Sequence, residues 1–234
     1  MSHECASKIR IMDLAALHKA LEGCPDLELR RAGEYKWYGR SVGDYAPPAL
    51  RQLSVIVDMV KEGHDVRAKA KEAGVELPAN LADLEYSPLS LDDINKLRQI
   101  PEFKAALDKQ AALIGKDAEF VIGYKEGHPK HGQAYEIGVI PHPTREGEYW
   151  MSVDYWQNGY GLFDAEGLGG VVQETHTDTA EDGTTKEVET TDWGQDLRQR
   201  YTLFAMQNRA EATGRKVTNV VKQEDGSLRM EIEE

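Results

Sequence analysis

No stretch of this sequence reaches the length that a transmembrane helix needs, about 20 consecutive apolar residues. Residues 1–10 also lack the apolar segment of a secretory signal peptide. Cysteine is scarce, because Cys5 and Cys24 are the only two in the chain. Two cysteines flanking an expected helix provide neither a disulfide framework nor a metal-knuckle spacing. We therefore expect no membrane span and no secretion, and we predict a cytoplasmic location.

Basic residues are outnumbered, with 28 Lys and Arg against 41 Asp and Glu and a formal net charge of −13. Such a field repels phosphate backbones unless basic residues cluster locally. Nucleic acid is therefore disfavoured as a partner, whereas a basic protein surface would be attracted.

Familiar catalytic signatures are also missing. The glycines of residues 159–161 and 167–170 are not followed by the Lys-Ser or Lys-Thr pair of a phosphate-binding loop, and no helix is expected after them. No Gly-X-Ser-X-Gly motif occurs, and neither cysteine has a histidine partner in sequence. We interpret the glycines as turn formers and expect no nucleophilic catalysis.

The hydrophobic pattern predicts an α+β fold. The chain opens with an expected strand over residues 6–11, a helix capped by Asp13, and a strand or hairpin over residues 27–38. Further strands are expected over residues 120–124, 135–140 and 149–156. A helix containing Leu197 and Tyr201 follows and stops at Gly214. A hairpin turning at Asp225-Gly226 closes the chain, and half of its last strand is expected to face the core.

Two segments interrupt this core of residues 1–45 and 118–234. Residues 46–117 read as a helical insertion, in which Leu50, Leu53, Val57 and Val60 share one helix face. Ser90 with Asp93 resembles a capping box, and Pro101 begins a further helix. Residues 174–191 are rich in Thr, Glu and Asp, so we expect a mobile acidic loop there. The predicted fold is a small, mainly antiparallel sheet with helices on one face, plus the helical insertion.

Three groups of residues suggest a family relationship: the opening residues 3–21, the phrases Gly123-Tyr124 and Tyr135-Glu136-Ile137-Gly138-Val139, and the closing residues 200–229. Together, in this order, they resemble the domain of unknown function 1257, a family of small chloroplast and cyanobacterial proteins with bacterial and phage relatives. The resemblance covers residues 1–45 and 118–234 and excludes the insertion and the acidic loop. Residues 37–45 look most like phage-carried versions, which suggests a bacterial cell or a phage-infected host. The resemblance implies a compact α+β fold and carries over no catalytic residue.

Residues 30–40 form a local basic and aromatic cluster suited to stacking on bases while neutralising phosphates. Its candidate binding residues are Arg30, Arg31, Tyr35, Lys36, Trp37, Tyr38 and Arg40. The alternative is structural, with Tyr35 and Trp37 facing the core and the basic residues forming a solvated flank. Aromatic residues are enriched in strands, so the structural alternative is favoured.

Imidazole and carboxylate side chains gather between residues 126 and 154, and these groups bind zinc and manganese. The candidate metal ligands are His128, His131, Glu136 and Asp154, with Asp44 and His142 as further members. Exposed loop histidines and solvated strand carboxylates are the alternative, which is favoured because the spacing is not diagnostic of a metal site.

These observations lead to a function hypothesis with two alternatives. We expect a non-enzymatic cytoplasmic interaction module that binds a protein or a small ligand, with a protein partner favoured. Its oligomeric state is left open, and no cofactor or catalytic residue is predicted. The alternatives are a metal-dependent hydrolase or nuclease, and a protein that binds single-stranded nucleic acid through residues 30–40.

Overall fold

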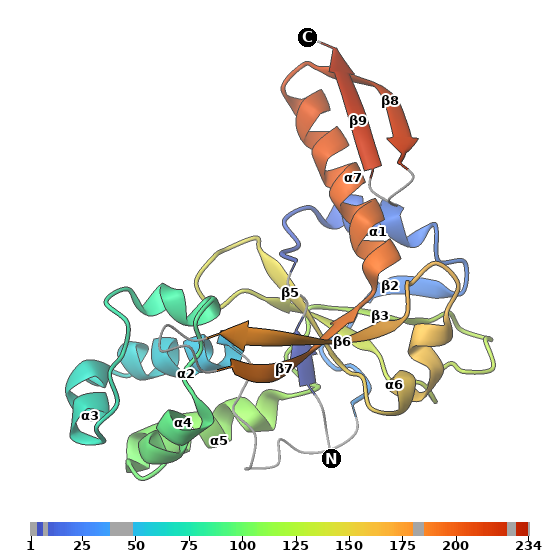
Figure 1. The fold of residues 1–234 in the computed structure, drawn as a ribbon. Coiled ribbons are helices and arrows are strands. Elements are labelled where there is room, and N and C mark those ends of the chain that lie inside the picture. The colour runs from blue at the N-terminus through green and yellow to red at the C-terminus, as the bar shows by residue number, and fades with distance from the viewer. Residues whose placement is uncertain (1–3, 7–8, 38–48, 180–184, 224–227, 234) are drawn as a thin grey trace.

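The computed structural model describes residues 4–6, 9–37, 49–179, 185–223 and 228–233. A five-stranded sheet in the order β1-β5-β4-β3-β2 forms the centre of this part of the chain (Figure 1). Every neighbouring pair in it is antiparallel. Its strands are β1 Glu4–Ala6, β2 Leu27–Arg31, β3 Phe120–Tyr124, β4 Ile137–Pro141 and β5 Tyr149–Asp154. The α+β class predicted from the sequence is confirmed.

Two helices cover one face of the sheet. They are α1 Leu14–Leu21 and α7 Gln195–Ala212, which pack against Ile122, Val139 and Met151 in the largest hydrophobic core. Asp13 caps α1 as predicted, because its Oδ1 accepts a hydrogen bond from the Ala16 amide at 2.9 Å. The same carboxylate accepts a second hydrogen bond from Asn208 of α7 at 2.8 Å, so the cap also ties the two helices together.

The insertion covers the opposite face. Its helices are α2 Ala49–Lys61, α3 Val66–Glu72, η1 Leu81–Glu85, α4 Leu91–Leu97 and α5 Pro101–Leu113. Ser90 caps α4 and hydrogen-bonds Asp93, and Pro101 is the first residue of α5, both as predicted. Leu50 and Leu53 pack on the sheet, whereas the rest of the insertion has a hydrophobic core of its own. The sheet therefore lies between two helical layers.

Helix α2 is buried on more sides than its apolar spacing predicted. Ile56 and Met59 are buried, and Val60 of the predicted face is exposed. The reason is that α2 contacts both the sheet and the separate core of the insertion, so its buried stripe widens and turns. Strand ends also differ from the prediction, since β1 ends at Ala6, with Ile11 forming an isolated bridge to Tyr149, and β2 ends at Arg31.

The acidic segment is not a loop in its described residues. Strands β6 Val171–Thr179 and β7 Thr185–Trp193 pair antiparallel along their whole length, so the predicted mobile loop over residues 174–191 is wrong there. Threonine is β-branched and favours strands, which the composition argument overlooked. Trp193 anchors the base of this hairpin in the main core. We call the hairpin of residues 171–179 and 185–193 the acidic arm.

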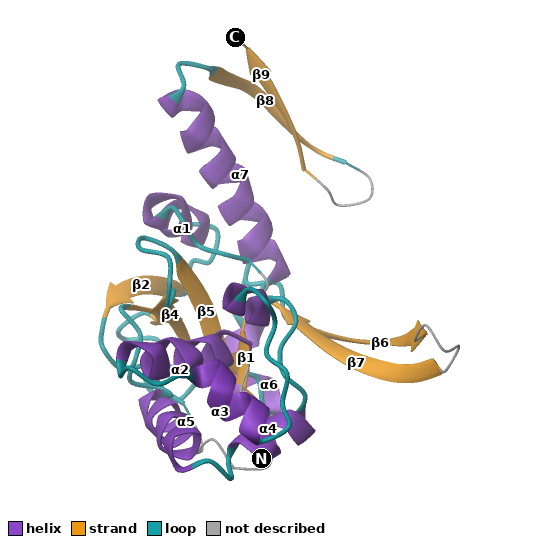
Figure 2. Ribbon diagram, turned by 90° about the vertical axis from the view of Figure 1, so that its left-hand side faces the viewer, coloured by secondary structure: helices purple, strands orange, loops and turns teal. Residues whose placement is uncertain are grey.

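The closing hairpin forms as predicted from β8 Lys216–Lys222 and β9 Leu228–Glu233, although its predicted Asp225-Gly226 turn lies outside the described residues. It does not face the main core. It turns back from the C-terminal end of α7 as a two-stranded sheet of its own (Figure 2). Val220 and Ile232 remain 39% and 43% exposed, although α7 packs beside this hairpin. We call residues 216–222 and 228–233 the terminal arm.

Candidate functional site

Glu136 lies at the centre of the predicted basic and aromatic cluster. Arg30 on β2 donates from Nη2 to Glu136 Oε1 at 2.5 Å, and the Lys36 amide donates to Glu136 Oε2 at 2.8 Å. The Glu136 amide in turn donates to the Lys36 carbonyl at 3.0 Å. Glu136 is buried, so these contacts compensate the cost of removing its carboxylate from water. The result is a clamp that fastens residues 32–37 onto the sheet.

Two strand glycines, Gly123 and Gly138, leave the space that these contacts occupy. A Cβ at Gly123 would lie 2.9 Å from Glu136 Oε1 and 3.0 Å from Arg30 Nη1. A Cβ at Gly138 would lie 2.5 Å from Cε1 of Tyr35, whose ring crosses the strand at that point. Neither position has a backbone conformation that requires glycine. The physical reason for glycine at both positions is that neighbouring side chains approach the strand too closely for a Cβ atom.

The structure therefore favours the structural alternative for residues 30–37. Tyr35 is buried and meets Trp37 edge-on at 6.2 Å between ring centroids, so its face is not open to a base. Arg31 is exposed and pairs with Glu119 at 3.3 Å. The Lys36 ammonium donates to the Gly132 carbonyl. Tyr38 and Arg40 lie outside the described residues.

The predicted metal ligands make separate contacts. His131 donates from Nδ1 to the Tyr124 carbonyl at 2.7 Å, since a carbonyl oxygen can only accept. The His128 ring stacks on the Tyr124 ring at 4.2 Å, and its Nδ1 accepts from the Lys130 amide. Asp154 is fully buried, and its Oδ1 accepts from the Trp156 amide at 3.0 Å.

Among the described residues, no group of three or more His, Cys, Asp or Glu side chains could hold a metal ion. The four-residue metal site predicted from His128, His131, Glu136 and Asp154 is therefore not assembled. Strands β4 and β5 pair as neighbours, with Glu136 just before β4 and Asp154 at the end of β5, but the Glu136 carboxylate pairs with Arg30 of β2. Asp44 lies outside the described residues.

A left-handed turn lies close to the histidines. The segment α6 Gln157–Gly161 has positive φ at every position, including the non-glycine residues Gln157, Asn158 and Tyr160. Each such residue costs about 1–2 kcal/mol. The Gly161 carbonyl accepts hydrogen bonds from the Tyr124 hydroxyl at 2.7 Å and the Lys130 ammonium at 3.3 Å, which helps to hold the turn. The glycines act here as turn formers, as predicted.

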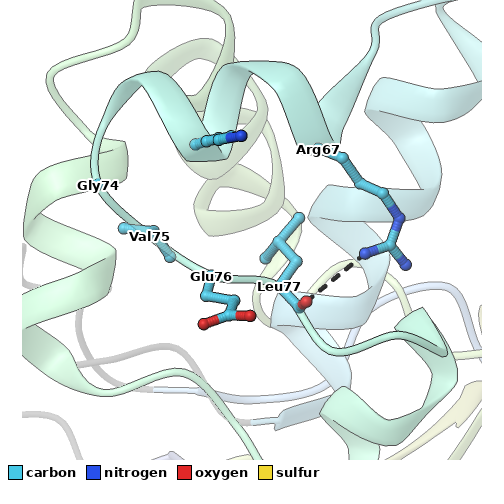
Figure 3. A pocket seen from close by; sticks show the side chains of 6 residues that line it. Arg67, Gly74, Val75, Glu76 and Leu77 are labelled. Carbon is cyan, nitrogen blue, oxygen red and sulfur yellow. Dashed lines mark hydrogen bonds between the residues drawn. The ribbon is translucent and has the colours of Figure 1, made fainter.

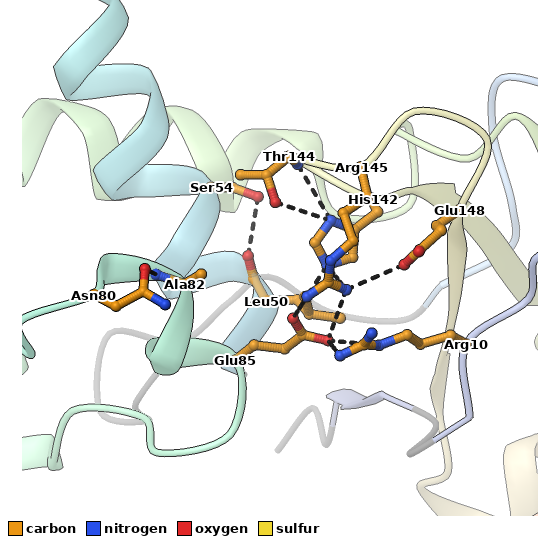
Figure 4. A network of polar contacts seen from close by, with 10 residues as sticks. All are labelled: Arg10, Leu50, Ser54, Asn80, Ala82, Glu85, His142, Thr144, Arg145 and Glu148. Atoms are coloured by element: carbon orange, nitrogen blue, oxygen red, sulfur yellow. Dashed lines mark hydrogen bonds and ion pairs between the residues drawn. The ribbon is translucent and has the colours of Figure 1, made fainter.

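A polar network that sequence reasoning missed joins the insertion to the sheet (Figure 4). Glu85 of η1 accepts from Arg10 Nε at 3.0 Å and pairs with the Arg145 guanidinium. His142 Nε2 lies 3.5 Å from Glu85 Oε2, while its Nδ1 accepts from the Thr144 amide at 3.2 Å. These residues are far apart in sequence, so no local signal linked them.

Burial and charge set the protonation of this network. Burial, together with the positive charge of Arg145, lowers the pKa of His142 below its ordinary value. Burial alone would raise the pKa of Glu85, but the hydrogen bonds from Arg145 and Arg10 hold it below the usual range. At neutral pH the network therefore combines an uncharged His142 imidazole with the Glu85 carboxylate, which two guanidinium groups hold in place. We call this network the polar joint.

The insertion also carries an open pocket of about 500 Å³ (Figure 3). Its lining residues are Arg67, Lys71, Gly74, Val75, Glu76 and Leu77. Arg67 donates to the Pro78 and Ala79 carbonyls, both at 2.8 Å, so its guanidinium holds the pocket wall. None of the site residues predicted from the sequence lies in this lining.

The acidic arm and the terminal arm are two further surfaces, and both extend away from the main core. In the described part of the chain, each arm is a sheet of two strands, with no third strand beside it. Each therefore presents unpaired backbone N–H and C=O groups along its outer edges, which are templates for strand addition. The sequence did not predict the acidic arm, because its composition is typical of a loop. It did not predict the terminal arm as a separate surface, because the last strand was expected to face the core.

The described residues contain no helix that is long and apolar enough to cross a membrane. Comparisons with family models, curated proteins and solved structures found no match, so the resemblance to the domain of unknown function 1257 stays a prediction.

Proposed function

We propose that this chain is a non-enzymatic interaction module that binds a basic segment of a protein partner along the acidic arm. The observation that carries the proposal is the arm itself. Two nine-residue strands leave the core at Trp193 and extend away from it, paired only with each other among the described residues (Figure 2). A strand pair with open edges can accept a third strand through main-chain hydrogen bonds.

Charge indicates the chemistry of the partner. Residues 171–193 contain seven Asp and Glu and one Lys. Opposite charge on a partner strand would steer the encounter, whereas a second acidic strand would be repelled. The arm is therefore suited to a segment that carries Lys or Arg and can extend as a strand.

Capture from a host lysate tests the proposal when three matched baits are compared. One is the unaltered chain, and the second carries Glu174→Gln, Asp178→Asn, Glu187→Gln and Glu189→Gln in the arm. The control bait removes four exposed charges elsewhere through Glu22→Gln, Glu72→Gln, Glu76→Gln and Glu126→Gln. We expect the unaltered and control baits to retain the same basic protein, and the arm variant to lose it.

The retained protein should also elute as salt rises, because the charges at this surface are screened. A protein retained equally by all three baits would contradict binding through the arm. Failure of the unaltered bait to retain any specific protein would contradict the interaction module itself.

A further inference from the structure

The terminal arm has two edges of different character. The β8 edge has Lys216 and Lys222 at its ends and an irregular register between Val217 and Asn219. Edge lysines and bulges are the devices that keep strand edges from pairing. Strand β9 has neither, and its sequence Leu-Arg-Met-Glu-Ile-Glu contains no proline or glycine. The β9 edge is therefore the one open to strand addition.

The charges of β9 are complementary to those of a second β9. When identical strands pair antiparallel about a residue, the residue before it lies opposite the residue after it on the other copy. Pairing about Met230 places Arg229 opposite the partner's Glu231, and the symmetry repeats this contact. Both side chains are exposed, and within one chain they approach no closer than 3.8 Å.

Other pairings of the same arm oppose like charges. Pairing of β9 about Glu231 would also place Arg229 opposite the partner's Glu233, but it would set two Glu231 carboxylates directly opposite each other. Pairing of β8 about Asn219 would place Lys216 opposite the partner's Lys222. Like charges directly opposite each other destabilise a strand pair, and pairing about Met230 avoids the like-charge pair that each of these two alternatives contains.

We propose that two copies of this chain associate through their β9 strands, antiparallel and centred on Met230, to form a four-stranded sheet. This inference goes beyond the proposed function, because it concerns self-association through the other arm. A hairpin of two strands is marginal in water, whereas four strands with a shared apolar face are stable. The register puts Val217 beside Ile232 and Val220 beside Met230, so each copy contributes such a face.

Sedimentation velocity of the purified protein over a range of concentrations, at low ionic strength, tests this pairing. The unaltered chain should dimerise. The Arg229→Glu variant faces two pairs of like negative charge in its dimer, and the Glu231→Arg variant faces two pairs of like positive charge. We expect each variant to dimerise about tenfold more weakly or worse.

Two further samples separate pairing from general charge effects. An equimolar mixture of the two single variants places opposite charges at both contacts, so it should form a mixed dimer. The double variant Arg229→Glu/Glu231→Arg should also dimerise like the unaltered chain. Because the two single changes shift the net charge in opposite directions, an effect of overall repulsion would not weaken both.

Several outcomes would overturn the inference. An unaltered chain that stays monomeric at all concentrations would do so, as would a dimer that both single variants leave intact. Single variants that weaken the dimer without rescue in the mixture would also do so. The measurement uses purified protein alone, so its result is independent of whether the acidic arm captures a partner.

Discussion

At the scale of single residues, the strongest constraint is the space that glycine leaves. Gly123 lies under the ion pair of Arg30 with Glu136, and Gly138 lies under the Tyr35 ring. Both glycines are strand residues that would otherwise weaken the sheet. Their absence of a side chain is what allows residues 32–37 to pack flat on the sheet.

Replacing Gly138 with alanine should therefore destabilise the protein. The added Cβ would lie 2.5 Å from the Tyr35 ring, so the ring or the strand must move. We expect the free energy of unfolding to fall by about 1–3 kcal/mol, measured by urea denaturation. Gly33→Ala is the matched control, because nothing lies within 4 Å of its new Cβ. Equal effects of the two substitutions would contradict the packing argument.

At the scale of elements, the acidic arm is joined to the core by its base rather than by its length. Trp193 is 2% exposed and meets the Phe163 ring at 5.9 Å, whereas the paired strands extend beyond the core. Removing a large buried aromatic side chain leaves a cavity. Removing strand residues beyond Val171 and Trp193 leaves the arm residues that belong to the main core in place.

Shortening the arm and substituting the residue at its base should thus change the free energy of unfolding by very different amounts. Deleting residues 174–190 and closing the strands with Asn-Gly should change the free energy of unfolding by less than about 1 kcal/mol, because the core contacts remain. Trp193→Ala should lower it by about 3–5 kcal/mol. Chemical denaturation of both variants checks this, and a large loss on shortening would show that the arm supports the core.

At the scale of the whole molecule, a polar network and the contacts of α2 join the insertion to the domain that contains the central sheet. The insertion has its own core, α2 fastens it to the sheet, and Glu85 connects it to Arg10 and Arg145 of the core domain. His142 belongs to the same joint and is almost completely buried. Protonation of the joint should therefore affect the stability of the folded chain.

The direction of this pH dependence follows from the lowered pKa of His142. The unfolded chain binds the extra proton below about pH 6.5, before the folded chain does. The stability that His142 contributes is thus complete above that pH and is lost as the pH falls through the folded-state pKa. Glu85, whose pKa is also lowered, adds a further loss below about pH 4.5.

Substituting His142 with glutamine should reduce the change in the free energy of unfolding with pH in the range where His142 titrates. The difference in the free energy of unfolding between pH 7 and pH 5 should shrink in His142→Gln, because the buried group no longer titrates. His18→Gln is the control, since His18 is an exposed residue on α1. Denaturation curves at both pH values provide the measurement. An unchanged difference in His142→Gln would mean that the joint does not control the acid sensitivity.

Local patterns in the sequence determined much of this protein: the α+β class, the Asp13 and Ser90 caps, the central strands, the helix that stops just before Gly214 and the closing hairpin. Caps, turns and periodicity act over a few residues, so they can be interpreted without knowing the fold. Tertiary structure alone decided that Glu136 pairs with Arg30 instead of joining a metal site, and that Glu85 lies beside His142. It also decided that both hairpins extend away from the core. Those outcomes depend on which distant segments pack together, and the spacing of residues along the chain does not indicate which segments will do so.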